Sequence, residues 1–482
     1  MRTRRIITLA VLFACGQTTA MGDRAERATV VRTPTVVRSG AKVDTSKEAT
    51  EAAPQTLGPL DNTAALKHLF EALGALDDGT ADTDVRIVQY GDSHTAADMM
   101  TGIARRALQA RFGDGGRGFV AIGRPWRAYW QDGVHSPGMT HDWNPEHGKI
   151  DHGHYVGDGC YGLGGVALVT SGQGARAWSE IAAPSSNIEV DYWEQPQGGS
   201  LDIIVDGKTA LTIHTRGAQP ASAFKSMEVP DGPHKIEMRA HGDGEVRVFG
   251  VTLDRAQVGV VYDALGINGA RASTTLRWNE AHLQEQLRHR APKLVVLAYG
   301  TNESADDGPL DQVERQLVDV LGRVARAVPT ASCLVMGPPD RAVASPSDNP
   351  YGDKDAGAIW STSPKLVQVV AVERRVAGAA GCAFYDQLSA MGGPGTIAAW
   401  AEADPPRAQR DRTHLTRDGY ALLGNAFAAD ILAAYGAWRL EHNLPPAKVQ
   451  PVRPVLPPMT PPDDVLPLPN TQANAPFVAI PL

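Results

Sequence analysis

An alternation of strand-like and helix-like segments, interrupted once, constrains this chain more than any other feature. Short runs rich in Val, Ile and Leu alternate with amphipathic segments, a pattern typical of a parallel sheet with helices on its faces. We therefore predict a doubly wound α/β domain. The expected strands are 85–90, 258–262, 294–298, 333–336 and 382–385, and the expected helices are 63–76, 95–112, 273–290, 309–327, 363–379 and 417–441.

The interruption follows the first predicted helix. Residues 113–160 are rich in Gly, Trp and His, and from 160 to 255 short strand patterns are separated by turns, including a hairpin signal at Asp206-Gly207. Several short strands with regular turns indicate a β-sandwich. We predict an all-β, jelly-roll-like module inserted into the α/β domain. The expected parts are 59–159 (first α/β part and active-site loops), 160–255 (inserted β-sandwich) and 256–442 (second α/β part).

Both ends of the chain differ in composition from the middle. Residues 1–20 join a basic start to an apolar run too short to span a bilayer, which indicates an export signal and a location in the periplasm or cell envelope. Two interpretations stay open: cleavage near residue 20, or a lipoprotein signal in which Cys15 becomes a lipidated membrane tether. Residues 21–58 are expected to be a flexible linker, and 443–482 a Pro-rich tail.

Charge and cysteine content narrow the partners and the compartment. A net charge of -8 disfavours a broad nucleic-acid-binding surface. Apart from Cys15, the cysteines are Cys160, Cys333 and Cys382, and none of their spacings is typical of zinc. In an oxidising compartment Cys333 and Cys382, which begin two predicted strands, are either disulfide-bonded or buried as free thiols.

Five residues lie where a doubly wound sheet binds its ligands, after strands or before the last helix. Ser93 suits a nucleophile, His414 its base, and Asp411 the carboxylate that orients the imidazole. Asn302, Gly269 and the backbone N–H of Ser93 suit an oxyanion hole. Each residue taken singly also fits a local role as a cap, a turn or a surface pair. Together they predict a serine esterase that needs no metal or cofactor.

The order of these blocks resembles the SGNH/GDSL hydrolase superfamily. The resemblance covers about 85–125 and 256–440 and rests on four segments. It implies a flavodoxin-like three-layer fold, with the roles given above for the site residues. Two departures are His94, where leucine is common, and Glu303, where aspartate often follows the asparagine. The four segments are Gly91–His94, Leu265–Ala270, Gly300–Glu303 and Asp411–His414.

A narrower resemblance comes from the β-insertion in an exported chain. With the segments 90–95, 251–254, 265–270 and 405–414, this architecture resembles bacterial peptidoglycan O-acetylesterases. The resemblance implies peptidoglycan as the partner and the 6-O-acetyl group of muramic acid as the substrate. Three alternatives stay open: an acetyltransferase, an esterase acting on another acetylated polysaccharide such as xylan, and a glycan-binding protein with a vestigial hydrolase site.

Two further groups of residues have weaker signals. Four tryptophans, Trp126, Trp130, Trp143 and Trp400, are candidates to stack on sugar rings, although aromatic side chains more often pack in a core. A histidine-rich stretch could bind a metal, but its irregular spacing favours polar loop residues. Its histidines are His135, His141, His147, His152 and His154.

Overall fold

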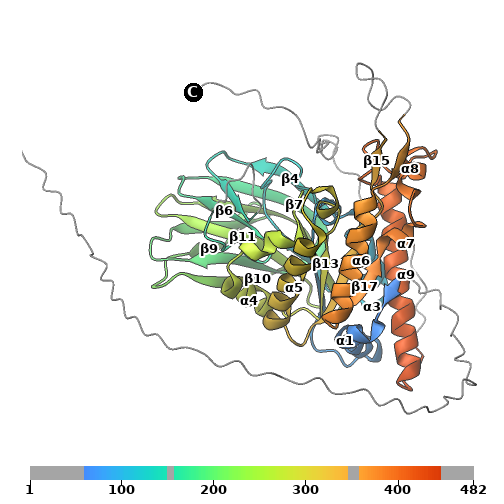
Figure 1. Cartoon of the computed structure of the whole chain (residues 1–482). Coiled ribbons are helices and arrows are strands. Elements are labelled where there is room, and N and C mark those ends of the chain that lie inside the picture. Colours follow the sequence, from blue (N-terminus) through green and yellow to red (C-terminus); the bar gives the residue numbers. More distant parts are fainter. Residues whose placement is uncertain (1–58, 149–156, 346–357, 447–482) are drawn as a thin grey trace, which may run out of the picture. The chain divides into compact units, whose positions relative to one another are not determined.

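The computed structural model describes residues 59–148, 157–345 and 358–446 (Figure 1). The predicted export signal with Cys15, the linker 21–58 and the tail from residue 447 lie outside the described residues. Within the described ranges, no helix is both long enough and apolar enough to cross a membrane.

The α/β part is built on a six-stranded sheet in the order β1-β17-β14-β13-β2-β12. All neighbours pair in parallel except β1, which is antiparallel to β17. Counted along the chain, the five parallel strands have the order 2-1-3-4-5 of flavodoxin-like folds, which confirms the predicted doubly wound sheet. The strands are β1 (Leu60–Asp61), β2 (Val85–Gly91), β12 (Val260–Gly266), β13 (Leu294–Ala298), β14 (Ser332–Gly337) and β17 (Ala383–Asp386).

Helices cover both faces of this sheet because its strands are apolar on both sides. On β2, Val88 and Tyr90 pack into one core with the helices α4, α5 and α6, whereas Val85 and Ile87 pack into another with α1, α3 and α9. The longer helices are α1 (Lys67–Asp78), α3 (Met99–Phe112), α4 (Glu280–Arg290), α5 (Leu310–Ala327), α6 (Pro364–Ala379) and α9 (Arg417–Glu441). The shorter elements are η1 (Thr63–Leu66), α2 (Ser93–Ala96), η2 (Ala272–Arg277), η3 (Glu303–Ala305), α7 (Gln387–Met391), α8 (Thr396–Ala401), β15 (Ala342–Ala344) and β16 (Trp360–Thr362).

The helix predicted at 95–112 is broken near its start. A single turn, α2, ends at Ala96, and α3 begins at Met99 after Asp98, whose backbone is left-handed with φ 43°. Asp98 tolerates this conformation because its buried carboxylate accepts hydrogen bonds from Arg105 and Arg117. Periodicity alone could not reveal this break, since the partners that favour it lie farther along the chain.

The β-rich part is a nine-stranded sheet whose strand pairs are all antiparallel. Three of its strands precede residue 160, earlier than predicted, because Gly and Pro within them obscure the strand pattern. The jelly-roll form of the insertion stays a prediction. The strands are β3 (Gly116–Val120), β4 (Val134–Met139), β5 (Asn144–His147), β6 (Val166–Thr170), β7 (Arg176–Glu194), β8 (Ser200–Val205), β9 (Lys208–His214), β10 (Ala221–Ala240) and β11 (Val246–Asp254).

Both halves of the long strand β7 face the same core, although side chains of a regular strand alternate between its two faces. In the first half the odd-numbered residues Ala177 and Ile181 lie in this core, and in the second half the even-numbered residues Ile188 and Val190 do. The register with β10 shifts on both sides of Gly232, opposite the segment between the pairs. A bulge of this kind rotates the strand, so that both halves bury their apolar side chains together.

Of the two alternatives left open for Cys333 and Cys382, the structure shows the disulfide. Cys333 in β14 and Cys382, just before β17, are bonded, with their Cα atoms 4.8 Å apart. Because β14 and β17 are neighbours in the sheet, the bond joins adjacent strands across a sequence separation of 49 residues. Cys160 is free and buried.

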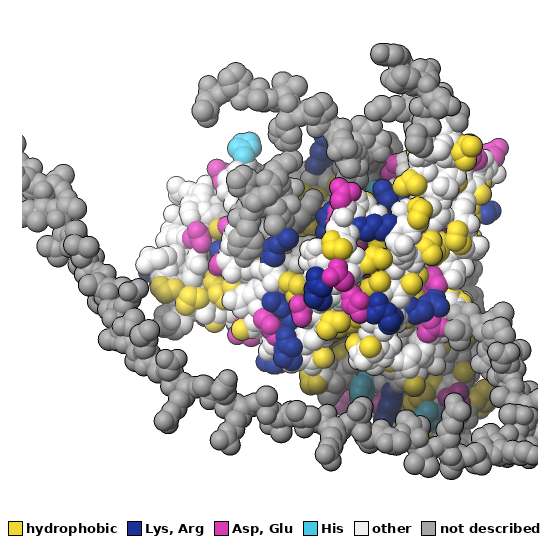
Figure 2. Space-filling model, in the orientation of Figure 1, with side chains coloured by type: hydrophobic (Ala, Val, Ile, Leu, Met, Phe, Trp, Pro, Cys, Tyr) yellow, Lys and Arg dark blue, Asp and Glu magenta, His cyan; other side chains and the backbone are white. Residues whose placement is uncertain are grey.

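The surface over the helices mixes charges of both signs. Figure 2 shows basic and acidic side chains interspersed across the face that carries α4, α5 and α6. Several of them form ion pairs, such as Arg375 with Glu314 and Arg326 with Glu280. This face offers no single-sign basic patch of the kind that binds nucleic acid.

Candidate active site

Three of the predicted blocks meet at the carboxyl edge of the parallel sheet. The N–H of Asp92, just after β2, donates to the carbonyl of Ala298 at the end of β13 (3.3 Å), and the N–H of Ile267, after β12, donates to the carbonyl of Gly91 (3.0 Å). From β2 the chain continues to β12 on one side of it and then to β13 on the other, so the strand order switches direction between β2 and β13. Ligands of such folds bind at this switch point. Ser93 therefore stands where the fold favours a ligand.

The turn that carries Ser93 requires a glycine at its start. A Cβ on Gly91 would lie 2.1 Å from Oγ1 of Thr95 and 2.7 Å from the carbonyl oxygen of Ala298, so no other side chain fits there. Asp92 then caps α2, because its side chain accepts the N–H of His94 at 2.9 Å. Ser93 is buried to 8% exposure as the first residue of α2.

The serine, the histidine and the aspartate form a continuous hydrogen-bonded chain. Oγ of Ser93 lies 2.9 Å from Nε2 of His414, and Nδ1 of His414 lies 2.7 Å from Oδ2 of Asp411. With the proton on Nδ1, the imidazole donates to Asp411 and accepts the Ser93 hydroxyl at Nε2. This arrangement activates a serine hydroxyl as a nucleophile.

A compact turn before α9 fixes Asp411 and His414. Oδ1 of Asp411 accepts the backbone N–H groups of Thr413 and His414, each at 3.0 Å, so the carboxylate both shapes the turn and binds the imidazole. Burial disfavours the charged form of Asp411, but the hydrogen bond and charge of His414 and the two N–H groups outweigh it, and the pKa of Asp411 is lowered. The carboxylate is therefore ionised at neutral pH.

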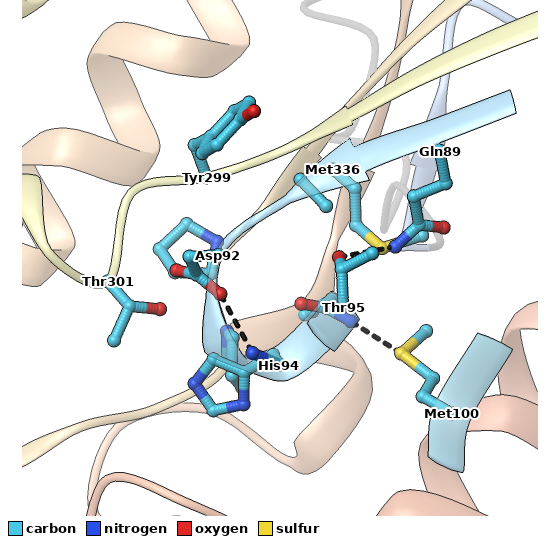
Figure 3. Close-up of a pocket in the computed structure, with 12 residues that line it drawn as sticks. Gln89, Asp92, His94, Thr95, Met100, Tyr299, Thr301 and Met336 are labelled. Carbon is cyan, nitrogen blue, oxygen red and sulfur yellow. Dashed lines mark hydrogen bonds between the residues drawn. The ribbon is translucent and has the colours of Figure 1, made fainter. Parts of the chain in front are cut away.

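Behind the nucleophile turn, His94 and Asp92 are buried in an interior region (Figure 3). Nδ1 of His94 lies 2.9 Å from the hydroxyl of Tyr420, and its ring centroid lies 5.4 Å from that of His414. Burial, together with the charge of His414, lowers the pKa of His94 to about 3, whereas burial raises that of Asp92 to about 7. His94 thus packs as a neutral ring against the catalytic candidate.

Asp92, His94 and Thr301 line a small cavity on this interior side. Its volume is about 10 Å³, enough for no more than about one water molecule. This space is too small for a substrate, and Ser93 does not line it. It belongs to the packing that supports the turn.

The two remaining predicted residues lie on loops that are joined to each other. Gly269 has φ 72°, which favours glycine, in the turn after β12. Nδ2 of Asn302 donates to the carbonyl of Ala270 at 2.9 Å, which leaves the second N–H of this amide for another acceptor. Gly269 and Asn302 therefore stand on adjoining loops beside the Ser93 turn. Their role as oxyanion donors stays a prediction.

The tryptophan and histidine candidates have different surroundings. Trp130 and Trp143 are buried, and Trp143 belongs to the core of the β-sheet, so it cannot stack on a sugar. Trp126 is only half-buried, and its Nε1 donates to Oδ1 of Asn268, next to Gly269. Among the described residues, no group of His, Cys, Asp or Glu is arranged to hold a metal; His152 and His154 lie outside them.

Sequence reasoning missed two supporting residues. Tyr420, in α9, contacts His94 and is a long-range partner with no local signal. Glu303 accepts N–H groups from two separate loops of the site. Its only sequence signal is its position directly after Asn302, where the superfamily often has an aspartate, and this signal assigned it no role.

Comparison with known proteins agrees with this geometry. Residues 235–422 match the GDSL-like lipase/acylhydrolase family. The matched segment contains Gly269, Asn302, Asp411 and His414. It does not include Ser93, which precedes the β-rich part in the sequence. No curated protein matches the chain.

Solved structures resemble the chain to different degrees. A structure described as a peptidoglycan O-acetylesterase in action is 22% identical, with a TM-score of 0.64 over 79% of this chain and 100% of that one. A family two carbohydrate esterase from Clostridium thermocellum with cellohexaose is 12% identical, with a TM-score of 0.24 over 56% of this chain and 95% of that one. An acetyl xylan esterase is 16% identical, with a TM-score of 0.25 over 36% and 81%. Only the first likeness is close enough to show a shared fold.

The family match and the hydrogen-bonded Ser-His-Asp chain indicate the same class of enzyme. Residues 235–422 match the GDSL-like lipase/acylhydrolase family, and the chain resembles a peptidoglycan O-acetylesterase in its fold. Both observations indicate a carboxylic ester hydrolase.

Proposed function

We propose that this protein is an exported serine esterase that removes O-acetyl groups from peptidoglycan, at the 6-O position of muramic acid. The observation that carries the esterase activity is the chain of hydrogen bonds from Ser93 through His414 to Asp411. The choice of peptidoglycan is supported by the fold, which matches a peptidoglycan O-acetylesterase along that protein's full length.

The proposed reaction is a two-step acyl transfer. Nε2 of His414 takes the Ser93 proton while Oγ attacks the acetyl carbonyl, and Asp411 stabilises the imidazolium that forms. The N–H groups of Ser93 and Gly269 and the amide of Asn302 would donate to the oxyanion. The imidazolium then protonates the leaving sugar oxygen. Water, deprotonated by the same histidine, releases acetate from the acetyl-serine.

Export is part of the proposal because two observations support it. The disulfide between Cys333 and Cys382 suits an oxidising compartment, and residues 1–20 have the composition of an export signal. A lipid tether at Cys15 would keep the enzyme close to the cell wall. Labelling cells with a lipid precursor, in wild type and Cys15→Ser, tests this tether directly.

The decisive assay measures acetate released from three substrates by the purified protein. We expect release from O-acetylated peptidoglycan, and none from the same polymer after chemical de-O-acetylation. Acetylated xylan serves as the competing substrate, and Ser93→Ala as the control for contaminating esterases. An acetyltransferase would instead move acetyl groups onto added glycan acceptors, which mass spectrometry detects.

Each result decides between the alternatives. Faster release from xylan than from peptidoglycan would contradict the proposed substrate but keep the esterase. No release from any ester, together with binding to glycan, would contradict the esterase and favour a binding protein. Equal release by wild type and Ser93→Ala would contradict Ser93 as the nucleophile.

A further inference from the structure

Glu303 is a buried carboxylate that contacts two loops distant in sequence. Its exposure is 5%. Oε1 accepts the N–H of Ala272 at 2.8 Å, and Oε2 accepts the N–H of Gly300 at 3.0 Å. We call the segments 267–272 and 300–303 the oxyanion loops, because they carry Gly269 and Asn302. One side chain therefore holds both oxyanion loops, with one oxygen for each.

Two other contacts also join the oxyanion loops or the residues beside them. Asn302 donates to the carbonyl of Ala270 at 2.9 Å. Arg271 donates to the carbonyl of Gly269 at 3.0 Å and pairs with Asp306, which follows the second loop. The Arg271–Asp306 pair is more than a third exposed on both sides, so water and salt weaken it. The buried carboxylate is the stronger link.

The contact of Glu303 with the two loops requires that both of its side-chain oxygens accept a hydrogen bond. Two backbone N–H groups converge on Glu303, and a carboxylate is the only side-chain group that offers two acceptor oxygens and no donor. Burial raises the pKa of Glu303, while the N–H groups of Ala272 and Gly300 and the charge of Arg271 oppose that rise. An amide at this position would direct its NH₂ group at one of the two N–H donors.

Resting on the proposed esterase function, we infer that Glu303 is a positioning residue for the oxyanion hole. Its carboxylate joins the two oxyanion loops and so sets where the donors of Gly269 and Asn302 stand relative to Ser93. Oxyanion donors act only when they are held in place before the reaction, so a looser clasp should weaken binding of the transition state more than binding of the ester.

The test uses the full chain and p-nitrophenyl acetate as the probe. Glu303→Gln keeps the size of the side chain and removes one acceptor; Glu303→Asp keeps both acceptors but is shorter by one methylene. Glu373→Gln is the matched control: Glu373, with 3% exposure, lies beside Gly300 of the second oxyanion loop, but the N–H groups of Gly300 and Ala272 both donate to Glu303 instead. For Glu303→Gln we expect kcat to fall about 10- to 100-fold, less than the roughly 10²–10³-fold effect of removing a donor, with KM changed less than about 3-fold.

A double-variant cycle separates positioning from mere structural support. If Glu303 acts through the oxyanion loops, Glu303→Gln should cost much less in an Asn302→Ala background than in the wild type. Additive effects of the two substitutions would overturn the inference. So would an unchanged kcat in Glu303→Gln, or an equal loss in Glu373→Gln. If Glu303→Gln does not fold, the same cycle with Glu303→Asp decides.

The inference and the proposed function can fail separately. Wild-type protein that releases no p-nitrophenol contradicts the esterase itself. Active wild type, inactive Ser93→Ala and a fully active Glu303→Gln leave the esterase in place and overturn only the role of Glu303.

Discussion

Replacing Asp411 by asparagine tests whether its carboxylate orients His414, the proposed catalytic histidine. The structure predicts that the turn survives, because an asparagine Oδ1 can still accept the N–H groups of Thr413 and His414, both at 3.0 Å. The NH₂ group would then replace Oδ2, which lies 2.7 Å from Nδ1 of His414. Two N–H donors cannot face each other, so the imidazole proton should move to Nε2 and block the Ser93 hydroxyl.

The expected size of the effect follows from this change of tautomer. We expect kcat to fall about 10³- to 10⁴-fold, as in serine enzymes whose histidine adopts the wrong tautomer. The loss of stability should be small, on the order of 1.5–3 kcal/mol for one charged hydrogen bond. Because the pKa of Asp411 is lowered in the fold, its carboxylate stabilises the protein above the unfolded pKa of 3.8. This contribution is lost as pH falls through the folded pKa, and the stability gap to Asp411→Asn should close there.

Steady-state kinetics on p-nitrophenyl acetate and urea unfolding at several pH values measure both effects. The matched control is Asp418→Asn, an exposed aspartate in the first turn of α9. Retention of more than a tenth of the wild-type kcat in a folded Asp411→Asn protein would refute the orienting role. A comparable loss in Asp418→Asn would show that charge in this segment, and not the contact with His414, is responsible.

Four further results are expected. Ser93→Ala should stay folded and lose at least about 10³-fold in kcat, which thermal melts and ester kinetics check together. Asn302→Ala should lower kcat by about 10²–10³ with little change in KM; unchanged kcat would reduce it to a turn residue. Replacing Cys333 and Cys382 together by alanine should cost up to about 4 kcal/mol in urea unfolding, the chain entropy of a 49-residue separation, and dithiothreitol should reproduce this in the wild type. The pKa of His94 is about 3 in the fold and 6.5 in the unfolded chain, so the unfolded chain binds a proton below pH 6.5 that the fold excludes. The free energy of unfolding should therefore fall by up to about 1.4 kcal/mol for each pH unit below 6.5, and His94→Leu should reduce this pH dependence in urea unfolding.

The sequence was sufficient for elements whose signal is local. The apolar runs of β2, β12, β13, β14 and β17 predicted the parallel sheet, because both faces of each strand are buried. The candidate triad was also predictable, since Ser93 directly follows a strand and Asp411 lies three residues before His414. The structure then brought these three together.

Features that depend on distant partners could not be predicted. Strand β3 contains Gly116 and Gly118, which weaken a strand pattern, yet it pairs with β11 more than a hundred residues later. Asp98, at the helix break, accepts a hydrogen bond from Arg117, and the proposed role of Glu303 depends on its contact with the N–H of Ala272. In each case one residue of the pair looks ordinary until the fold supplies the other.

The large β-rich insertion leaves the site intact because of where the chain departs and returns. The chain leaves the α/β part at Gly113, after α3, and returns at Val260, the first residue of β12, whose N–H donates to the carbonyl of Gly113 at 2.9 Å. Parallel strands such as β2 and β12 need a crossover connection in any case, and an excursion whose ends meet changes neither their register nor their spacing. The return point is the amino end of β12, whereas Ser93 and Gly269 follow the carboxyl ends of β2 and β12. The insertion can therefore supply new surface near the sheet without interrupting a turn that carries the proposed chemistry.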